Sequence, residues 1–189
     1  MADFEEKGLV ELTQKPVCEK LGTMDTASGK IEIVNSRWEK AGIASLPPYV
    51  ARPVPKPGLY RLTIGGCAIH AAGHTINNRR LFSQMPENAL WMHDSAARDL
   101  GVSDGESVVV SNNGYSATIK ARVSPYMHPE AVFMVHGFGR SIPAEYRACG
   151  KGASDISLMS GGLNHWDPAG GGLAFQEHFV SVKKMQQPG

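Results

Sequence analysis

The stretch from Gly65 to Asn78 holds the residues best suited to binding a polar ligand. It reads GGCAIHAAGHTINN, in which three glycines and three alanines would allow another molecule close to the backbone. Its His, Thr and Asn residues supply hydrogen-bonding groups. The spacing is neither the dinucleotide fingerprint G-x-G-x-x-G nor a P-loop, because no G-K-[ST] closes it. The residue types therefore predict a binding loop, and an ordinary connection between a strand and a helix is the alternative.

Two histidines of this stretch, His70 and His74, have a spacing that can chelate a metal when both lie on one helix. The intervening Gly73 weakens a helix, and no H-E-x-x-H pattern is present. We therefore expect no metal site there.

The remaining reactive residues do not form a recognisable catalytic set. No two of the three cysteines form a C-x-x-C pair, and an iron–sulfur cluster normally takes four thiolates. There is no G-x-S-x-G pattern for a nucleophile. Arg140 and Arg147 are candidates for engaging phosphate or another anion. We predict no catalytic residue in this chain.

Composition indicates one soluble globular domain, or one domain with an extended arm. The chain has 189 residues, of which 42% are hydrophobic and 20% charged, and its net charge is +1. That balance argues against a general nucleic-acid binder. No apolar run approaches the ~18 residues of a membrane span. Residues 1–7 are acidic and lack a signal-peptide core, so we expect no export by the chain's own sequence.

Residues 1–58 are expected to form an extended arm or linker. Within them, residues 30–34 alternate as a short strand does, and residues 35–41 suit one or two helical turns. Five prolines between residues 46 and 57 exclude regular helix or a central strand.

Residues 59–184 are expected to form a compact, mainly β domain, followed by a disordered tail at 185–189. Asp94 is the expected N-cap of a short helix with Gly101 at its end, and Asn112-Asn113-Gly114 predicts a hairpin. Turn residues, rather than regular helices, separate the strands, which favours a β-barrel over a doubly wound sheet. The long glycine-rich segment 137–172 is typical of a loop that covers a site. The expected strands are 59–64, 89–92, 106–111, 115–123, 131–136 and 175–183, and the expected helices are 78–84 and 95–100.

Several segments, in the same order, resemble the C-terminal molybdopterin-dinucleotide-binding domain of the dimethyl-sulfoxide-reductase superfamily. Within that superfamily the chain is most similar to the catalytic subunits of thiosulfate and polysulfide reductases. The resemblance covers about residues 25 to 184. The superfamily segments are 26–32, 65–78, 85–93, 96–110 and the Asp167-Pro168 pair with the following glycines. The subfamily segments are 128–139, 150–155 and 172–179.

The resemblance implies a six- to seven-stranded double-psi β-barrel that helps to bind two molybdopterin guanine dinucleotides (bis-MGD). Relatives often carry Arg or Lys where Gly66 stands and Lys where Gln176 stands, so contacts at these positions are expected to come from the backbone. The residues implied to contact the cofactor are Gly65, Gly66, Cys67, His70, Gly73, His74, Thr75, Asp155, Phe175 and Gln176.

The resemblance also implies a parent enzyme, a molybdenum-dependent reductase of anaerobic respiration whose 4Fe-4S cluster and metal ligand lie in domains absent from this chain. Its implied partners are the other domains of the large subunit, an iron–sulfur electron-transfer subunit and a membrane anchor, with no nucleic acid. The parent is expected to be periplasmic or membrane-associated in a bacterium, and this chain to be inactive alone. The alternatives are a separate small subunit that docks onto a molybdenum or tungsten enzyme, and an unrelated double-psi barrel that binds proteins.

Overall fold

The computed structural model divides the chain into two units, Met1–Ala51 and Arg52–Gly189. In the first unit, α3 (Ser36–Lys40) begins after Asn35, whose side chain accepts a hydrogen bond of 3.0 Å from the Arg37 amide. This helix agrees with the turns predicted for residues 35–41. The structure describes residues 6, 8, 24–46, 48–112, 114–142, 147–159, 167, 171–172 and 178–186.

The strand predicted for residues 30–34 is wrong. No strand is assigned in this segment, and the side chains of Ile31 and Ile33 are 71% and 80% exposed. Alternating residues favour a strand only where a neighbouring strand pairs with the backbone and one face is buried. Among the described residues of the first unit, no strand pairs with residues 30–34 and neither face of this segment is buried.

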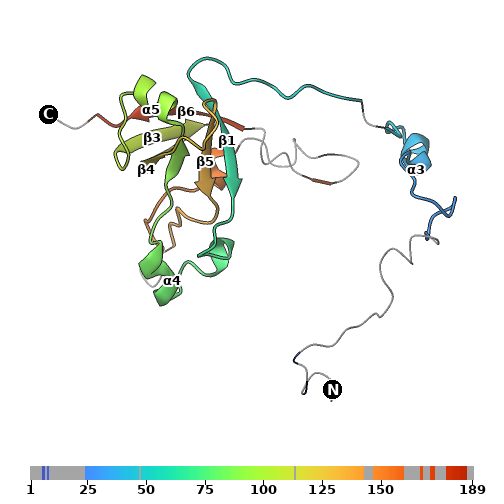
Figure 1. Cartoon of the computed structure of the whole chain (residues 1–189), viewed down its shortest axis with the longest axis horizontal. Coiled ribbons are helices and arrows are strands. Elements are labelled where there is room, and N and C mark those ends of the chain that lie inside the picture. The colour runs from blue at the N-terminus through green and yellow to red at the C-terminus, as the bar shows by residue number, and fades with distance from the viewer. Residues whose placement is uncertain are drawn as a thin grey trace. The chain divides into compact units, whose positions relative to one another are not determined.

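In the second unit, the strands assigned among the described residues close into one barrel in the order β1-β5-β2-β4-β3-β6. β1 pairs in parallel with β5 and β2 with β4, while the other neighbouring pairs are antiparallel (Figure 1). This is a double-psi β-barrel, as expected from the sequence. The strands are β1 (Leu59–Gly65), β2 (Leu90–Met92), β3 (Ser107–Asn112), β4 (Tyr115–Val123), β5 (Ala131–Val135) and β6 (His178–Lys184).

Alternation along the strands fills the barrel interior. In β3, Val108 and Val110 are fully buried, and Ile119 and Ala121 of β4 join them in one hydrophobic core. The predicted hairpin is confirmed, because Asn112 pairs with Tyr115 and Gly114 has a φ of +77°. Such a φ is favourable for glycine, which has no Cβ. Asn113 and residues 175–177 of the predicted last strand lie outside the described residues.

Among the described residues of the second unit, two short α-helices flank the strands, α4 (Arg79–Gln84) and α5 (Asp94–Asp99). Asn78 caps α4, accepting from the Arg80 and Leu81 amides. The predicted N-cap Asp94 is wrong: His93 takes that role, because its Nδ1 accepts from the Ser95 amide at 3.0 Å. Asp94 is the first helical residue and pairs with Arg98. Among the described residues, no helix has the length and apolar character needed to cross a membrane.

Glu106, at the entry to β3, should make stability depend on pH. The Ser103 amide and the Lys184 ammonium hydrogen-bond its carboxylate and lower its pKa below the ordinary 4.5. A lowered folded-state pKa stabilises the fold above the unfolded pKa, and this contribution is lost as pH falls through the folded pKa. Glu106→Gln should therefore slightly lower the melting temperature at pH 7 and have a smaller effect near pH 3. A difference that is unchanged between these pH values would contradict the assignment.

Candidate functional site

The parallel strands β1 and β5 end side by side, with Gly65 opposite Val135. The pairing continues one step further, because the His136 amide donates to the Gly65 carbonyl at 2.9 Å. The described residues that follow these strands, 66–78, 136–142 and 147–155, lie with α4 at the end of the barrel remote from α5 (Figure 1). The predicted binding loop and part of the predicted covering loop therefore meet.

A second, smaller hydrophobic cluster supports these segments. Ile76, Val135, Phe138 and Ala148 are buried in it, and Cys67, Met85 and Phe133 pack against it. The described part of the 137–172 segment is also hydrogen-bonded to itself, since the Gly139 amide donates to Lys151 and the Gly150 amide to Arg140. The loops thus form a packed platform.

Glycines let the two segments touch. A Cβ on Gly137 would lie 2.6 Å from the Gly73 amide nitrogen, closer than side chains tolerate. Arg140 then joins both segments, donating from Nη2 to the Gly73 carbonyl at 2.7 Å and from Nε to the Gly137 carbonyl at 3.4 Å. Arg140 is a candidate anion ligand by sequence, and in this structure its guanidinium braces the binding loop.

His70 and Thr75, both predicted cofactor contacts, hold the loop from inside. His70 is 3% exposed, its Nε2 is 2.9 Å from the Met85 carbonyl, and its ring meets Phe138 edge-on. Thr75 Oγ1 accepts from the Ala71 amide at 2.9 Å and is 3.4 Å from His70 Nδ1. Both ring nitrogens of His70 therefore have partners within the protein.

The beginning of the loop is open to a ligand. Gly66 is exposed, and a Cβ built on it would meet nothing within 4 Å. Within the described part of the chain, the amides of Gly66, Ala68 and Ile69 have no hydrogen-bond acceptor. Unpaired backbone amides that lie close together in a turn are suitable donors to an anion.

The other predicted residues of this loop differ in their surroundings. Gly65 packs against Phe133, since an added Cβ would lie 3.1 Å from that ring. Cys67 is partly buried, and its Sγ accepts from the His70 amide at 3.3 Å. His74 is exposed at the end of the 3₁₀ turn η1 (Ala72–His74). Phe175 and Gln176 lie outside the described residues, so their predicted roles have no structural description.

Charge at this end of the barrel is strongly one-sided. In the described residues of 65–88, 136–142 and 147–155, the carboxylates are those of Asp155, which is 1% exposed, and Glu87, which pairs with Lys120. The net charge of +1 conceals this local excess, which attracts anions. The cationic side chains of the same segments are those of Arg79, Arg80, Arg140, Arg147 and Lys151.

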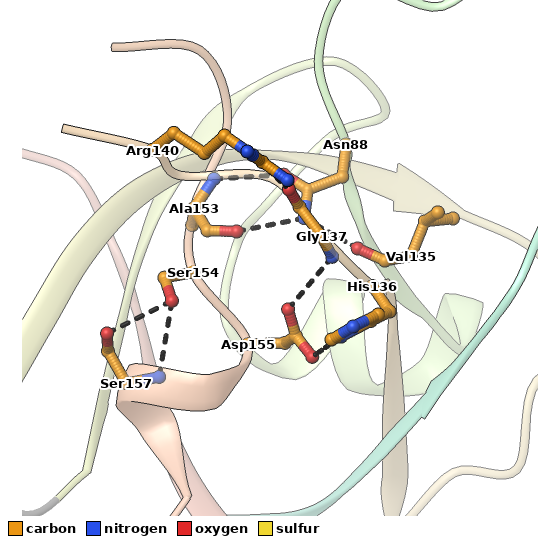
Figure 2. A network of polar contacts seen from close by, with 9 residues as sticks. All are labelled: Asn88, Val135, His136, Gly137, Arg140, Ala153, Ser154, Asp155 and Ser157. Atoms are coloured by element: carbon orange, nitrogen blue, oxygen red, sulfur yellow. Dashed lines mark hydrogen bonds and ion pairs between the residues drawn. The ribbon is translucent and has the colours of Figure 1, made fainter. Parts of the chain in front are cut away.

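Asp155 belongs to a buried polar network (Figure 2). Its Oδ2 is 2.7 Å from His136 Nδ1, and its Oδ1 accepts from the Gly137 amide at 3.2 Å. Asn88, buried nearby, donates to the Val135 and Ala153 carbonyls and accepts from the Ala153 amide. Asn88 could not be selected from the sequence, because an asparagine in a turn before a strand has no local signature of its long-range contacts.

No group of three or more potential metal-binding side chains occurs among the described residues. Cys67 and Cys149 are free thiols, and Cys18 lies outside the described part. The donors that are present, amides and cations around an open glycine, fit the diphosphate of a nucleotide-like ligand better than a metal ion.

Residues 62–176 match the family described as "Molydopterin dinucleotide binding domain". The chain belongs to this family, which confirms the resemblance found in the sequence, and it is a molybdopterin-dinucleotide-binding domain of a molybdoenzyme-type subunit.

Two known proteins are similar over most of the chain. The thiosulfate reductase molybdopterin-containing subunit PhsA of Salmonella typhimurium is 29% identical over 136 residues, covering 70% of this chain and 18% of that protein. Acetylene hydratase from Pelobacter acetylenicus superposes with a TM-score of 0.70 at 18% identity, covering 86% of this chain and 24% of that one. The second likeness shows the fold. The chain spans less than a fifth of the length of PhsA.

Proposed function

We propose that this chain is the molybdopterin guanine dinucleotide-binding domain of a molybdenum-dependent thiosulfate or polysulfide reductase. The similarity to a thiosulfate reductase subunit supports the substrate class. The observation that carries the binding role is the open amide group of Gly66, Ala68 and Ile69 at a barrel end where the described cationic side chains outnumber the carboxylates.

In this proposal the loop amides donate to the diphosphate, and the surrounding cations raise the local concentration of the anion. Arg140 and His70 keep the loop in place through the contacts described above. The cofactor, when bound, supplies the redox chemistry, while this chain binds and orients it. We assign the remaining features to the parent enzyme. They are the contacts to the second dinucleotide, the 4Fe-4S cluster, the electron-transfer partners and a periplasmic or membrane-associated location.

The binding role can be tested by NMR on the full chain, with guanosine diphosphate and inorganic pyrophosphate as probes. We expect amide shifts concentrated at Gly66, Ala68 and Ile69, with the β3–β4 hairpin unaffected. Lys151→Gln should weaken binding about twofold through loss of one nearby charge. Lys183→Gln, which removes an equally exposed lysine on β6, should leave the affinity unchanged. Shifts scattered over the barrel, or none, would contradict the proposal.

The substrate class needs the full-length parent enzyme. With a common electron donor, we expect reduction of thiosulfate or polysulfide and much slower reduction of dimethyl sulfoxide and nitrate. Preference for either of the latter would reject the sulfur-compound assignment without affecting the binding role.

A further inference from the structure

We propose that His136 contacts the diphosphate of the dinucleotide through Nε2, and that buried Asp155 is the positioning residue that holds its imidazole in place. This inference rests on the proposed function and assigns a ligand contact to a residue that the sequence analysis did not select. It also gives Asp155 an indirect role in place of the direct cofactor contact implied by the resemblance.

His136 lies at the start of the candidate site. It follows β5 directly, and its amide is bonded to the carbonyl of Gly65, the residue before open Gly66. Its side chain is 38% exposed, whereas Asp155 is 1% exposed. Nδ1 faces the Asp155 carboxylate, so Nε2 is the nitrogen left for a ligand, and no described residue bonds to it.

Asp155 is 1% exposed and both of its oxygens have partners in the protein, so it is poorly placed for a direct contact. One oxygen faces His136 and the other accepts from the Gly137 amide. A buried carboxylate is tolerated when it is hydrogen-bonded in this way. A carboxylate bonded to one imidazole nitrogen fixes the proton there and orients the ring, as it does for histidines that bind metals.

Asn88 holds His136 and Asp155 in their relative positions. Its side chain bonds to Val135, the residue before His136, and to Ala153, two residues before Asp155. One buried side chain thus ties together the two backbone segments that carry the pair (Figure 2). The geometry of the pair is therefore set before a ligand arrives.

The surroundings of His136 select an anion as its ligand. The neighbouring loop offers amide donors, and the described carboxylates at this end are already paired, Asp155 with His136 and Glu87 with Lys120. When protonated, the imidazole donates from Nδ1 to Asp155 and from Nε2 to a phosphate oxygen, a charge-assisted bond.

The test uses the full chain with inorganic pyrophosphate and guanosine diphosphate, measured by calorimetry and by NMR of the histidine ring nitrogens. His136→Gln should weaken binding about tenfold, the effect of losing one hydrogen bond to a charged group. His128→Gln, at the opposite end of β5 and exposed, is the matched control and should bind as the wild type does. In the wild type, the proton should reside on Nδ1, and the Nε2 resonance should shift when pyrophosphate binds.

Asp155→Asn should weaken binding and should also remove the preference of the His136 proton for Nδ1. A purely structural role of Asp155 would not require this change in the ring-nitrogen spectrum. If this variant fails to fold, the wild-type ring-nitrogen spectrum decides, and a proton on Nε2 alone would overturn the inference. Equal binding by His136→Gln and the wild type, with the Gly66 to Ile69 amides still shifting, would reject the inference and leave the proposed function standing. The absence of any shift in the wild type would reject both.

Discussion

Replacing Gly139 with alanine is expected to destabilise the barrel domain by about 3 kcal/mol. Gly139 has a φ of +73°, and an added Cβ would lie 2.5 Å from the Ala153 carbonyl carbon and 2.7 Å from Ser154 Cα. Both are backbone atoms, so neither can move without shifting the segment that carries Asp155. Urea denaturation followed by circular dichroism gives the free energy of unfolding directly.

Gly150→Ala is the matched control for this experiment. Gly150 has nearly the same φ, +69°, but a Cβ there would meet nothing within 4 Å. Its cost should be limited to backbone strain, about 1 kcal/mol. Equal losses in the two variants would mean that strain, rather than close packing against residues 153–154, explains the glycine at 139.

The Gly139 variant should also bind pyrophosphate more weakly. The Gly139 amide donates to the Lys151 carbonyl, so a displaced turn carries residues 151–155 with it. His136 would then lose its positioning carboxylate even in molecules that remain folded. Normal affinity in a destabilised variant would separate the stability role of this contact from the binding role.

Asn88→Ala is the second large expected effect, a loss of about 3 kcal/mol. The side chain is 1% exposed, and its removal leaves the Val135 carbonyl and both backbone groups of Ala153 without their partner. Each unsatisfied buried group costs about 1–3 kcal/mol, and local relaxation recovers part of the sum.

Asn88→Asp should be worse than Asn88→Ala at neutral pH. The substitution preserves shape but replaces the donating amide with a carboxylate oxygen that faces two carbonyl oxygens. Asn78→Ala, which removes the exposed N-cap of α4, provides the comparison and should cost about 1 kcal/mol. If Asn88→Asp is no more destabilising than Asn78→Ala, Asn88 is not the clamp described here.

Local patterns in the sequence determined much of this protein. Alternating residues predicted the strand from Tyr115 to Val123 with its observed bounds, because a strand that buries one face against a core alternates in this way. Asn112 to Gly114 predicted the hairpin, and Asn35 and Asn78 mark the starts of two helices. These features depend on residues adjacent in the chain. The clustering of small residues after Gly65 likewise identified the candidate loop without knowledge of the fold.

Only the tertiary structure decided what individual side chains in that loop can reach. His70 and His136 are both histidines beside glycine-rich segments, yet one is enclosed against Met85 and Phe138 and the other is partly exposed beside Asp155. The difference arises from parallel pairing of β1 with β5, which joins residues about 70 positions apart. Long-range pairing of this kind leaves no local periodicity, because it depends on how the whole barrel closes. For the same reason residues 30–34 alternate like a strand, but no strand is assigned beside them among the residues that the structure describes.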